Sequence, residues 1–179
     1  MTNAPRMTDG GRSVERPLVV VMGVSGSGKS TIGHRLAESL GAEFIDGDAL
    51  HPPANVAKMA AGIPLTDEDR WPWLAAVGRT LADSGPAGMV IACSALRRVY
   101  RAAILDQAPT ARFVELDGSP ELLRGRMGAR EGHFMPPSLL DSQLATLEPL
   151  APDEPGIRVG IDRSEEEITA AAASALRIR

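Results

Sequence analysis

The chain has 179 residues, of which 44% are hydrophobic and 23% charged, with a formal net charge of −4; these values are typical of one globular domain. The mildly acidic balance excludes a dedicated duplex-binding surface, and no apolar run is long enough to span a bilayer. The one cysteine, Cys93, excludes an intramolecular disulfide, and the three histidines lack the spacing of metal ligands. We therefore expect a cytoplasmic protein that binds neither nucleic acid nor membrane.

Residues 1–16 show no hydrophobic periodicity and no signal-peptide core, so we expect a disordered extension followed by one domain over residues 17–179. Within that domain, short apolar runs alternate with helical patterns. The runs are Leu18–Met22, Glu43–Asp46, Met89–Cys93, Arg112–Leu116 and Ile157–Ile161. This alternation predicts an α/β fold, a parallel sheet covered by helices on both faces.

Capping residues mark four helices. The predicted helices run from about Lys29 to Gly41, from the Thr66 and Asp69 cap through Leu81, from Ser119–Pro120 to about Met127, and from Glu165 to Leu176 behind a Ser164 and Glu167 capping box. The stretch 128–137 contains two glycines and two prolines without periodicity. It is typical of a mobile loop.

The strongest motif is Gly23-Val24-Ser25-Gly26-Ser27-Gly28-Lys29-Ser30, which follows a predicted strand and opens a predicted helix. In such a P-loop the backbone N–H groups surround phosphate oxygens, the lysine bridges the β- and γ-phosphates, and the hydroxyl ligates Mg²⁺. We therefore predict that ATP and Mg²⁺ bind here. The nucleotide-binding residues are Gly23, Val24, Ser25, Gly26, Ser27, Gly28, Lys29, Ser30 and Thr31.

A P-loop alone does not say what is done with the nucleotide. A guanine-nucleotide switch needs an Asn-Lys-x-Asp segment, and the one lysine outside the loop, Lys58, lies in Ala-Lys-Met-Ala. Large ATP-driven machines need a longer chain. The remaining class is a kinase that transfers a phosphoryl group from ATP to a small molecule.

Two carboxylates, Asp46 and Asp48, stand at the end of the second predicted strand, where α/β sheets place their chemistry. Because residues two apart in an extended segment point to the same side, both are expected to face the cleft. We assign Asp48 to the acceptor hydroxyl and Asp46, with Ser30, to Mg²⁺. The reverse order of the two aspartates, or a solvated turn, stays open.

The segment 46–74, DGDALHPPANVAKMAAGIPLTDEDRWPWL, resembles the small P-loop gluconokinases, which are related to shikimate kinases and nucleoside monophosphate kinases. MGVSGSGKST, CSALRRVYR and REGHF extend the match from about Val19 to Ile168. The resemblance implies a three-layer fold with a central five-stranded parallel sheet and a mobile lid at about 124–137. It also implies a homodimer and ATP-dependent phosphorylation of D-gluconate at its 6-hydroxyl.

An acidic polyol needs at least one cation and several hydrogen-bonding groups. The predicted acceptor-binding residues are Asp48, His51, Asn55, Lys58, Arg70, Ser94, Arg97 and His133. Arg70 and Arg97 are the first choices for the substrate carboxylate, and Lys58 is the third. The alternatives are an ion pair of Arg70 with a neighbouring aspartate, a solvated Lys58, and a His51 that only caps a turn. Gluconokinases often have lysine where this chain has Arg97.

In related kinases, lid arginines stabilise the transferred phosphoryl group. Arg126 and Arg130 match the lid positions of the family and are predicted to be catalytic with Lys29 and Asp48, whereas Arg124 does not clearly match. Surface charges on a helix are the alternative for all three arginines. Adenine is expected near residues 161–163.

Other side chains have simpler interpretations. We expect Trp71 and Trp73 to pack in the core or at an interface rather than stack on a sugar. We expect Cys93 to be a small buried apolar side chain. Two other functions stay open. One is a kinase for another acceptor, such as shikimate or a nucleotide, and the other is a non-catalytic ATP-binding protein.

Overall fold

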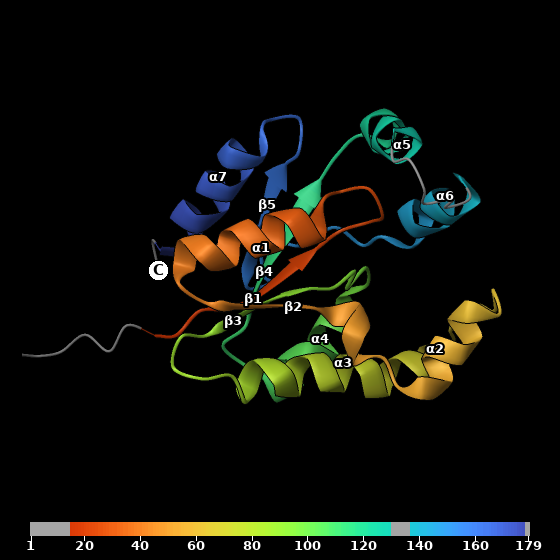
Figure 1. Ribbon diagram of the computed structural model, residues 1–179, viewed down its shortest axis with the longest axis horizontal. Coiled ribbons are helices and arrows are strands. Elements are labelled where there is room, and N and C mark those ends of the chain that lie inside the picture. The colour runs from red at the N-terminus through yellow and green to blue at the C-terminus, as the bar shows by residue number, and fades with distance from the viewer. Residues whose placement is uncertain (1–14, 130–136, 178–179) are drawn as a thin grey trace, which may run out of the picture.

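The computed structural model describes residues 15–129 and 137–177. The strands are β1 (Leu18–Met22), β2 (Glu43–Asp46), β3 (Met89–Ala92), β4 (Arg112–Asp117) and β5 (Gly156–Gly160). The α-helices are α1 (Lys29–Leu40), α2 (Pro53–Ala60), α3 (Asp67–Ala82), α4 (Arg98–Gln107), α5 (Pro120–Gly128), α6 (Pro137–Thr146) and α7 (Glu165–Arg177), and a short 3-10 helix, η1, spans Gly47–Leu50. Figure 1 shows their arrangement.

The strands form one parallel five-stranded sheet in the order β2-β3-β1-β4-β5. β1 lies at the centre, with Val20 opposite Ile91 of β3 and Phe113 of β4. The chain runs from β1 to β2 on one side of the sheet, and later passes from β3 to β4 on the other side of β1, so ligands are expected at the carboxyl ends of the strands around β1. The P-loop follows β1 directly at this edge of the sheet (Figure 1).

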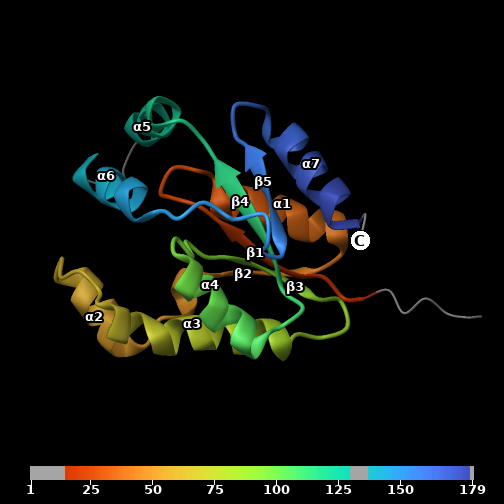
Figure 2. The same ribbon diagram turned by 180° about the vertical axis from the view of Figure 1, so that it is seen from behind.

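Alternate residues of β1 belong to two separate cores. Val20 and Met22 pack in the core that contains the buried residues of α3 and α4. Val19 and Val21 pack in the core that contains those of α1 and α7. Figures 1 and 2 show the two helix pairs on opposite faces of the sheet. Because both faces are covered, all five residues of β1 are buried.

The α/β fold and the five strands are confirmed, with strand ends that differ from the prediction by one residue in β3, β4 and β5. All four predicted helices are present, and both capping boxes form, at Thr66 and Asp69 and at Ser164 and Glu167. Helices α2, α4 and α6 are not among the predicted elements. Arg16, which was placed in the extension, donates hydrogen bonds to the carbonyls of Ala82 and Ser84.

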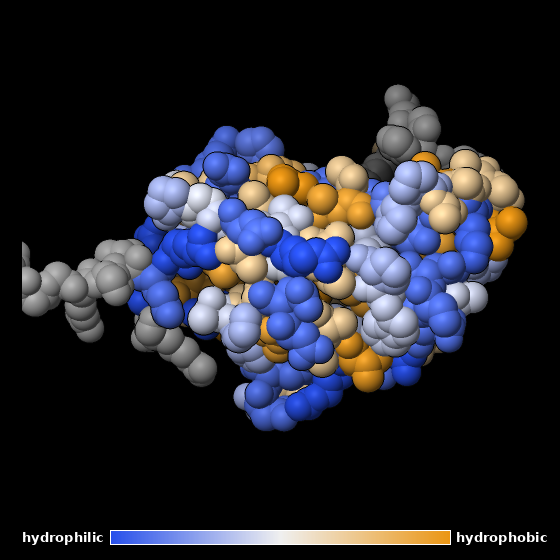
Figure 3. Space-filling view, turned by 90° about the horizontal axis from the view of Figure 1, so that it is seen from below, coloured by the Kyte–Doolittle hydropathy of each residue, from blue (hydrophilic) through white to orange (hydrophobic). Residues whose placement is uncertain are grey.

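The surface on the side of α2 and α3 is shown in Figure 3, where small hydrophobic patches lie among hydrophilic residues. Large exposed hydrophobic side chains near α2 and the start of α3 are Val56, Met59, Ile63 and Trp71. Across residues 15–129 and 137–177, no helix combines the length and apolarity that a membrane span requires.

Candidate active site

The P-loop wraps the start of α1. Gly28, the N-cap residue of α1, has a φ of 92°, a left-handed conformation that glycine adopts without strain. The N–H groups that follow point out of the helix end, where they and the helix dipole attract an anion. Lys29 Nζ donates to the carbonyl oxygen of Val24, 3.1 Å away, and so lies across the loop.

Two side chains from the α5–α6 side reach the P-loop. Arg126 lies beside Gly28, because a Cβ on this glycine would be 3.9 Å from Arg126 Nη1. Arg126 Nη2 also donates to the carbonyl of Ile161, at 2.7 Å. Gln143 Oε1 accepts a hydrogen bond from the Ser25 N–H at 2.6 Å. Helices α5 and α6 lie at the same end of the molecule as this loop (Figures 1 and 2).

Asp46 connects the P-loop to the next strand. Ser30 Oγ donates to Asp46 Oδ2 at 2.8 Å, and Asp46 Oδ1 accepts the Asp48 N–H at 3.0 Å. The prediction that Asp48 lies in an extended segment is wrong, because the chain turns into η1 immediately after Asp46. Gly47 makes this turn possible, since a Cβ there would be 2.6 Å from the Ala92 carbonyl oxygen.

The Ser30 and Asp46 pair fits Mg²⁺. Mg²⁺ prefers hard oxygen ligands in an octahedron, in which adjacent ligand oxygens are about 3 Å apart. The 2.8 Å between Ser30 Oγ and Asp46 Oδ2 matches that spacing. In the described part of the chain, no cluster of three histidine, cysteine, aspartate or glutamate residues offers a metal cage. A Mg²⁺ ion here would therefore take its other ligands from phosphate and water.

The ring of His51 packs against Trp73, beside the turn that carries Asp48. It stacks on Trp73 with ring centroids 4.1 Å apart, and Trp73 Nε1 donates to the Gly47 carbonyl at 2.8 Å. The backbone N–H of His51 also caps η1, as the alternative interpretation expected. Burial lowers the pKa of the imidazole, with the nearby charge of Arg70 adding to the effect and Asp48 opposing it. Trp73 thus packs, as predicted, whereas Trp71 is exposed.

Lys58 is held by α3. Its Nζ lies 2.8 and 2.7 Å from the two carboxylate oxygens of Asp69. This ammonium, with the Thr66 backbone N–H, lowers the pKa of Asp69 to about 2. The ion pair fixes α2 against the start of α3. Lys58 is therefore not simply solvated.

Asp67 lies between two arginines. It accepts hydrogen bonds from Arg70 Nη1 at 3.3 Å, from Arg97 Nη1 at 3.0 Å and from the Tyr100 hydroxyl at 2.5 Å. The Tyr100 hydrogen bond, followed by the arginine charges, lowers the pKa of Asp67. Arg97 Nε lies 3.6 Å from Glu148 Oε1. The ion pair of Arg70 with Asp67, the alternative to substrate binding, is thus present without substrate.

Around these arginines is a hollow of about 470 Å³. Its polar and charged lining residues are Arg70, Arg97, Tyr100, Thr146 and Glu148. A guanidinium has five N–H donors, more than the Asp67 and Glu148 contacts use. The hollow can therefore offer cationic donors to a further carboxylate.

The loop between β3 and α4 is held in place by a buried arginine. Arg101 forms a two-pronged ion pair with Glu154, at 2.6 and 2.8 Å, and Arg101 Nη1 donates to the Ala95 and Glu148 carbonyls. Ala95 has a positive φ of 43°, which a non-glycine residue rarely adopts. The loop carries Arg97, and it carries Ser94, whose carbonyl accepts the Gly23 N–H at 3.3 Å.

Cys93 precedes this loop and is buried, as predicted, which raises the pKa of its thiol to about 12. Arg124 is exposed and pairs with Asp141 at 2.9 Å, which fits the surface-charge alternative. Arg130, His133 and half of the expected lid, residues 130–136, lie outside the described residues. Of the predicted nucleotide-binding residues, Ser30 and Thr31 at the start of α1 are exposed.

Three residues of the site were missed. Tyr100 and Glu148 reach the arginine hollow, and Gln143 reaches the P-loop, from segments without a predicted role. Tyr100 lies inside the CSALRRVYR match, which was the available signal. For Gln143 and Glu148 the sequence contains no comparable signal.

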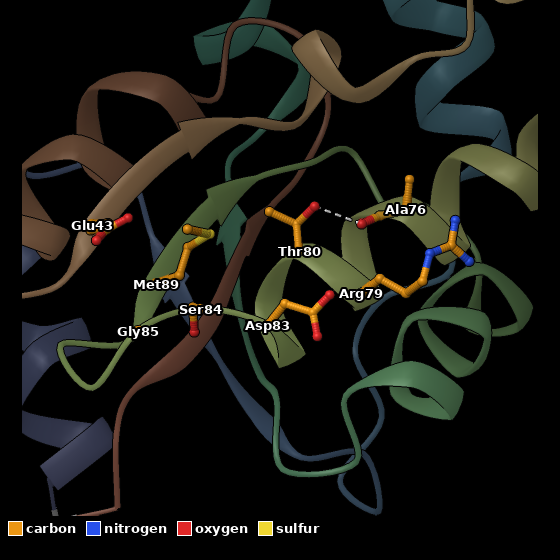
Figure 4. A pocket seen from close by; sticks show the side chains of 8 residues that line it. All are labelled: Glu43, Ala76, Arg79, Thr80, Asp83, Ser84, Gly85 and Met89. Carbon is orange, nitrogen blue, oxygen red and sulfur yellow. Dashed lines mark hydrogen bonds between the residues drawn. The ribbon is translucent and has the colours of Figure 1, made fainter.

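A second hollow, of about 490 Å³, lies at the other edge of the sheet. Its lining includes Glu43 and Met89, at the amino-terminal ends of β2 and β3, and Arg79 and Asp83 near the end of α3. Figure 4 shows Arg79 extending away from Glu43 and Met89. Because the strands are parallel, this hollow is on the edge opposite the P-loop.

These features define a P-loop kinase. They are the P-loop after the central strand, the serine and aspartate at the spacing of metal ligands, and the cationic hollow at the same sheet edge. Residues 18–150 match the AAA domain family. A gluconokinase from Gluconobacter oxydans (strain 621H) is 51% identical over 84% of this chain and 85% of its own. The thermosensitive gluconokinase of Escherichia coli (strain K12) is 44% identical over 84% of this chain and 82% of its own.

The comparison with solved structures leads to the same family. A gluconokinase from Sinorhizobium meliloti 1021 superposes with a TM-score of 0.81 at 50% identity, covering 89% of this chain and 91% of that one. Shikimate kinase from Aquifex aeolicus, at 16% identity and a TM-score of 0.56 over 88% of this chain and 94% of its own, shares the fold alone. The chain belongs to the gluconokinase family.

Proposed function

We propose that the protein transfers the γ-phosphoryl group of ATP to the 6-hydroxyl of D-gluconate, giving 6-phospho-D-gluconate and ADP. The observation that carries the proposal is the link from Ser30 through Asp46 to Asp48, which places an exposed carboxylate beside the P-loop. The names and the 42–51% identities of the bacterial and animal relatives support gluconate as the acceptor.

On the nucleotide side, the P-loop N–H groups and Lys29 hold the β- and γ-phosphates. Arg126 lies beside the loop and stabilises the charge on the group being transferred. Arg130 is proposed for the same role from the lid. The adenine is proposed to lie near Ile161, whose carbonyl binds Arg126.

On the acceptor side, Asp48 orients the 6-hydroxyl and takes its proton as the oxygen attacks the γ-phosphorus and ADP leaves. Gluconate has one carboxylate and five hydroxyls, so its far end needs a cation. Arg70 and Arg97 are proposed to bind that carboxylate in the 470 Å³ hollow. Ser94, Lys58 and His133 are proposed to contribute hydrogen bonds to the hydroxyls.

Mg²⁺ is proposed as the metal, bound by Ser30 and Asp46, where it would neutralise phosphate charge. A homodimer is proposed because the family resemblance implies one, and a cytoplasmic location is proposed with it. Light scattering during gel filtration measures the oligomeric state.

The test is ADP release measured with gluconate, shikimate and nucleoside monophosphates as separate acceptors. Gluconate is expected to give turnover well above the others. Lys29→Ala is the matched control and is expected to lose ~10²–10³-fold in kcat while its unfolding midpoint stays unchanged. Turnover with another acceptor that equals or exceeds the turnover with gluconate, or ATP binding without ADP release for any acceptor, would refute the proposal.

A further inference from the structure

The exposed carboxylate of Asp48 stands over a buried imidazole. The His51 side chain is 4% exposed whereas that of Asp48 is 86% exposed, and His51 Nε2 lies 4.0 Å from Asp48 Oδ1. The stacking on Trp73 limits how the ring can turn, and Trp73 also holds the carbonyl of Gly47, the residue before Asp48. One indole thus fixes both the ring and the backbone beneath the carboxylate.

The hydrogen bonds of Asn55 determine which nitrogen of His51 carries the proton. Asn55 is buried, and its Nδ2 donates to the Asp69 carbonyl oxygen at 2.8 Å and lies 3.2 Å from His51 Nδ1. A carbonyl oxygen only accepts, so the amide NH₂ group must face Asp69. The NH₂ group only donates, so His51 Nδ1 must accept.

A neutral imidazole that accepts at Nδ1 has its proton on Nε2. Nε2 is the nitrogen that faces Asp48. Burial lowers the pKa of His51, which favours the neutral ring. The chain of contacts therefore runs from α3 through Asn55 of α2 to His51 and ends with an N–H aimed at the carboxylate.

We propose that His51 is a positioning residue for Asp48: its Nε2–H holds Asp48 Oδ1, so that Oδ2 is presented to the acceptor hydroxyl. The proposal rests on the proposed function, in which Asp48 takes the hydroxyl proton. The 4.0 Å separation closes to a hydrogen bond when the acceptor binds, as catalytic hydrogen bonds commonly tighten in the ternary complex. A neutral donor orients the carboxylate without placing a full positive charge against it.

This assignment changes the role of two predicted acceptor-binding residues. Asn55 uses its two amide hydrogens within the protein, on Asp69 and His51. His51 uses Nδ1 on Asn55 and directs Nε2 to Asp48. Both therefore act on the acceptor through Asp48. The HPPAN segment that resembles the gluconokinases is then explained as the support of this carboxylate.

Three substitutions at His51 separate the roles of its two nitrogens. In His51→Gln, the side-chain amide nitrogen can take the place of Nε2. In His51→Asn, the amide nitrogen takes the place of Nδ1. His51→Phe keeps the stacking on Trp73 but has no polar atom. We expect His51→Gln to keep kcat within about tenfold, and the other two to lower it at least ~100-fold. The KM for gluconate should change less than about threefold.

His51→Phe with unchanged kcat and a raised KM would overturn the proposal, because that pattern indicates direct contact with the acceptor. A His51→Gln variant as impaired as His51→Phe would overturn it too. Thermal unfolding of each variant checks folding.

A second readout does not depend on enzymatic activity. Nitrogen-15 NMR of the wild-type protein is expected to show His51 Nδ1 as an unprotonated nitrogen and Nε2 as a protonated one. The His51 resonances are identified as those absent from the spectrum of the His51→Gln variant. A proton on Nδ1 would overturn the proposal. If the NMR result is as expected but wild-type protein does not phosphorylate gluconate, the proposed function fails instead.

Discussion

Ser30 Oγ donates a 2.8 Å hydrogen bond to Asp46 Oδ2, and this contact joins the first turn of α1 to the end of β2. Helix α1 begins just after β1, and Asp46 is the last residue of β2, so both side chains lie at the carboxyl edge of the parallel sheet. The two oxygens are already at the spacing of neighbouring Mg²⁺ ligands. In the proposed function, the nucleotide and acceptor halves of the site meet at this pair.

Removing either oxygen of the pair should weaken the binding of Mg²⁺. Ser30→Ala and Asp46→Asn are each expected to raise the Mg²⁺ concentration for half-maximal activity by ~10-fold or more, because fewer hard oxygen ligands remain. Mg²⁺ titrations at saturating ATP and gluconate measure this. Ser39→Ala, at the exposed far end of α1, is the control. An unchanged Mg²⁺ requirement in both variants would remove the pair from the metal site.

The arginine hollow should select for the carboxylate of the acceptor. Arg70→Ala is expected to raise the KM for gluconate by ~10–100-fold, because a hydrogen bond to a charged group contributes about 1.5–3 kcal/mol. A neutral hexitol lacks the carboxylate, so its weak turnover should not change. Arg79→Ala, on the same helix but in the opposite hollow, is the control. Equal losses for gluconate and the hexitol would contradict carboxylate recognition.

The buried Arg101 and Glu154 pair should matter far more for stability than an exposed pair. Arg101→Met leaves the Glu154 carboxylate buried without its cation, which typically costs ~3–5 kcal/mol. Arg124→Met breaks the exposed pair with Asp141 and should cost at most ~1 kcal/mol. Urea unfolding of the two variants provides the comparison. Similar free energies of unfolding would show that Arg101 does not hold the β3–α4 loop.

Acid should weaken the contact between α2 and α3. Lys58 lowers the pKa of Asp69 from 3.8 to about 2, so the folded state releases this proton more readily than the unfolded chain. The resulting stabilisation is complete above about pH 4 and is lost as the pH falls towards 2. Lys58→Met is expected to show a weaker fall of the unfolding midpoint over that range. Parallel pH profiles of variant and wild type would contradict the ion pair.

Local signals predicted much of the fold. The P-loop, its strand and α1 lie next to one another in sequence, and each capping box joins residues only three positions apart, so their geometry depends little on distant packing. The contact of Ser30 with Asp46 could be expected in outline because Ser30 follows β1 and Asp46 ends the parallel strand β2.

Other features depend on tertiary packing. The turn after Asp46 needs the close approach of Gly47 to β3, and the hydrogen bond from Tyr100 to Asp67 depends on how α4 packs against α3. Gln143 reaches the P-loop only because α6 returns to the same sheet edge. None of these contacts has a spacing signature, so sequence alone could not place them.

The most direct test is the turnover of Asp48→Asn with gluconate, measured beside its affinity for ATP. The change removes the proton acceptor but keeps the shape of the side chain. We expect kcat to fall ~10²–10⁴-fold, the usual contribution of a general base, with the Kd for ATP unchanged. Gluconate turnover equal to that of the wild-type protein would contradict the assignment of Asp48 to the acceptor hydroxyl.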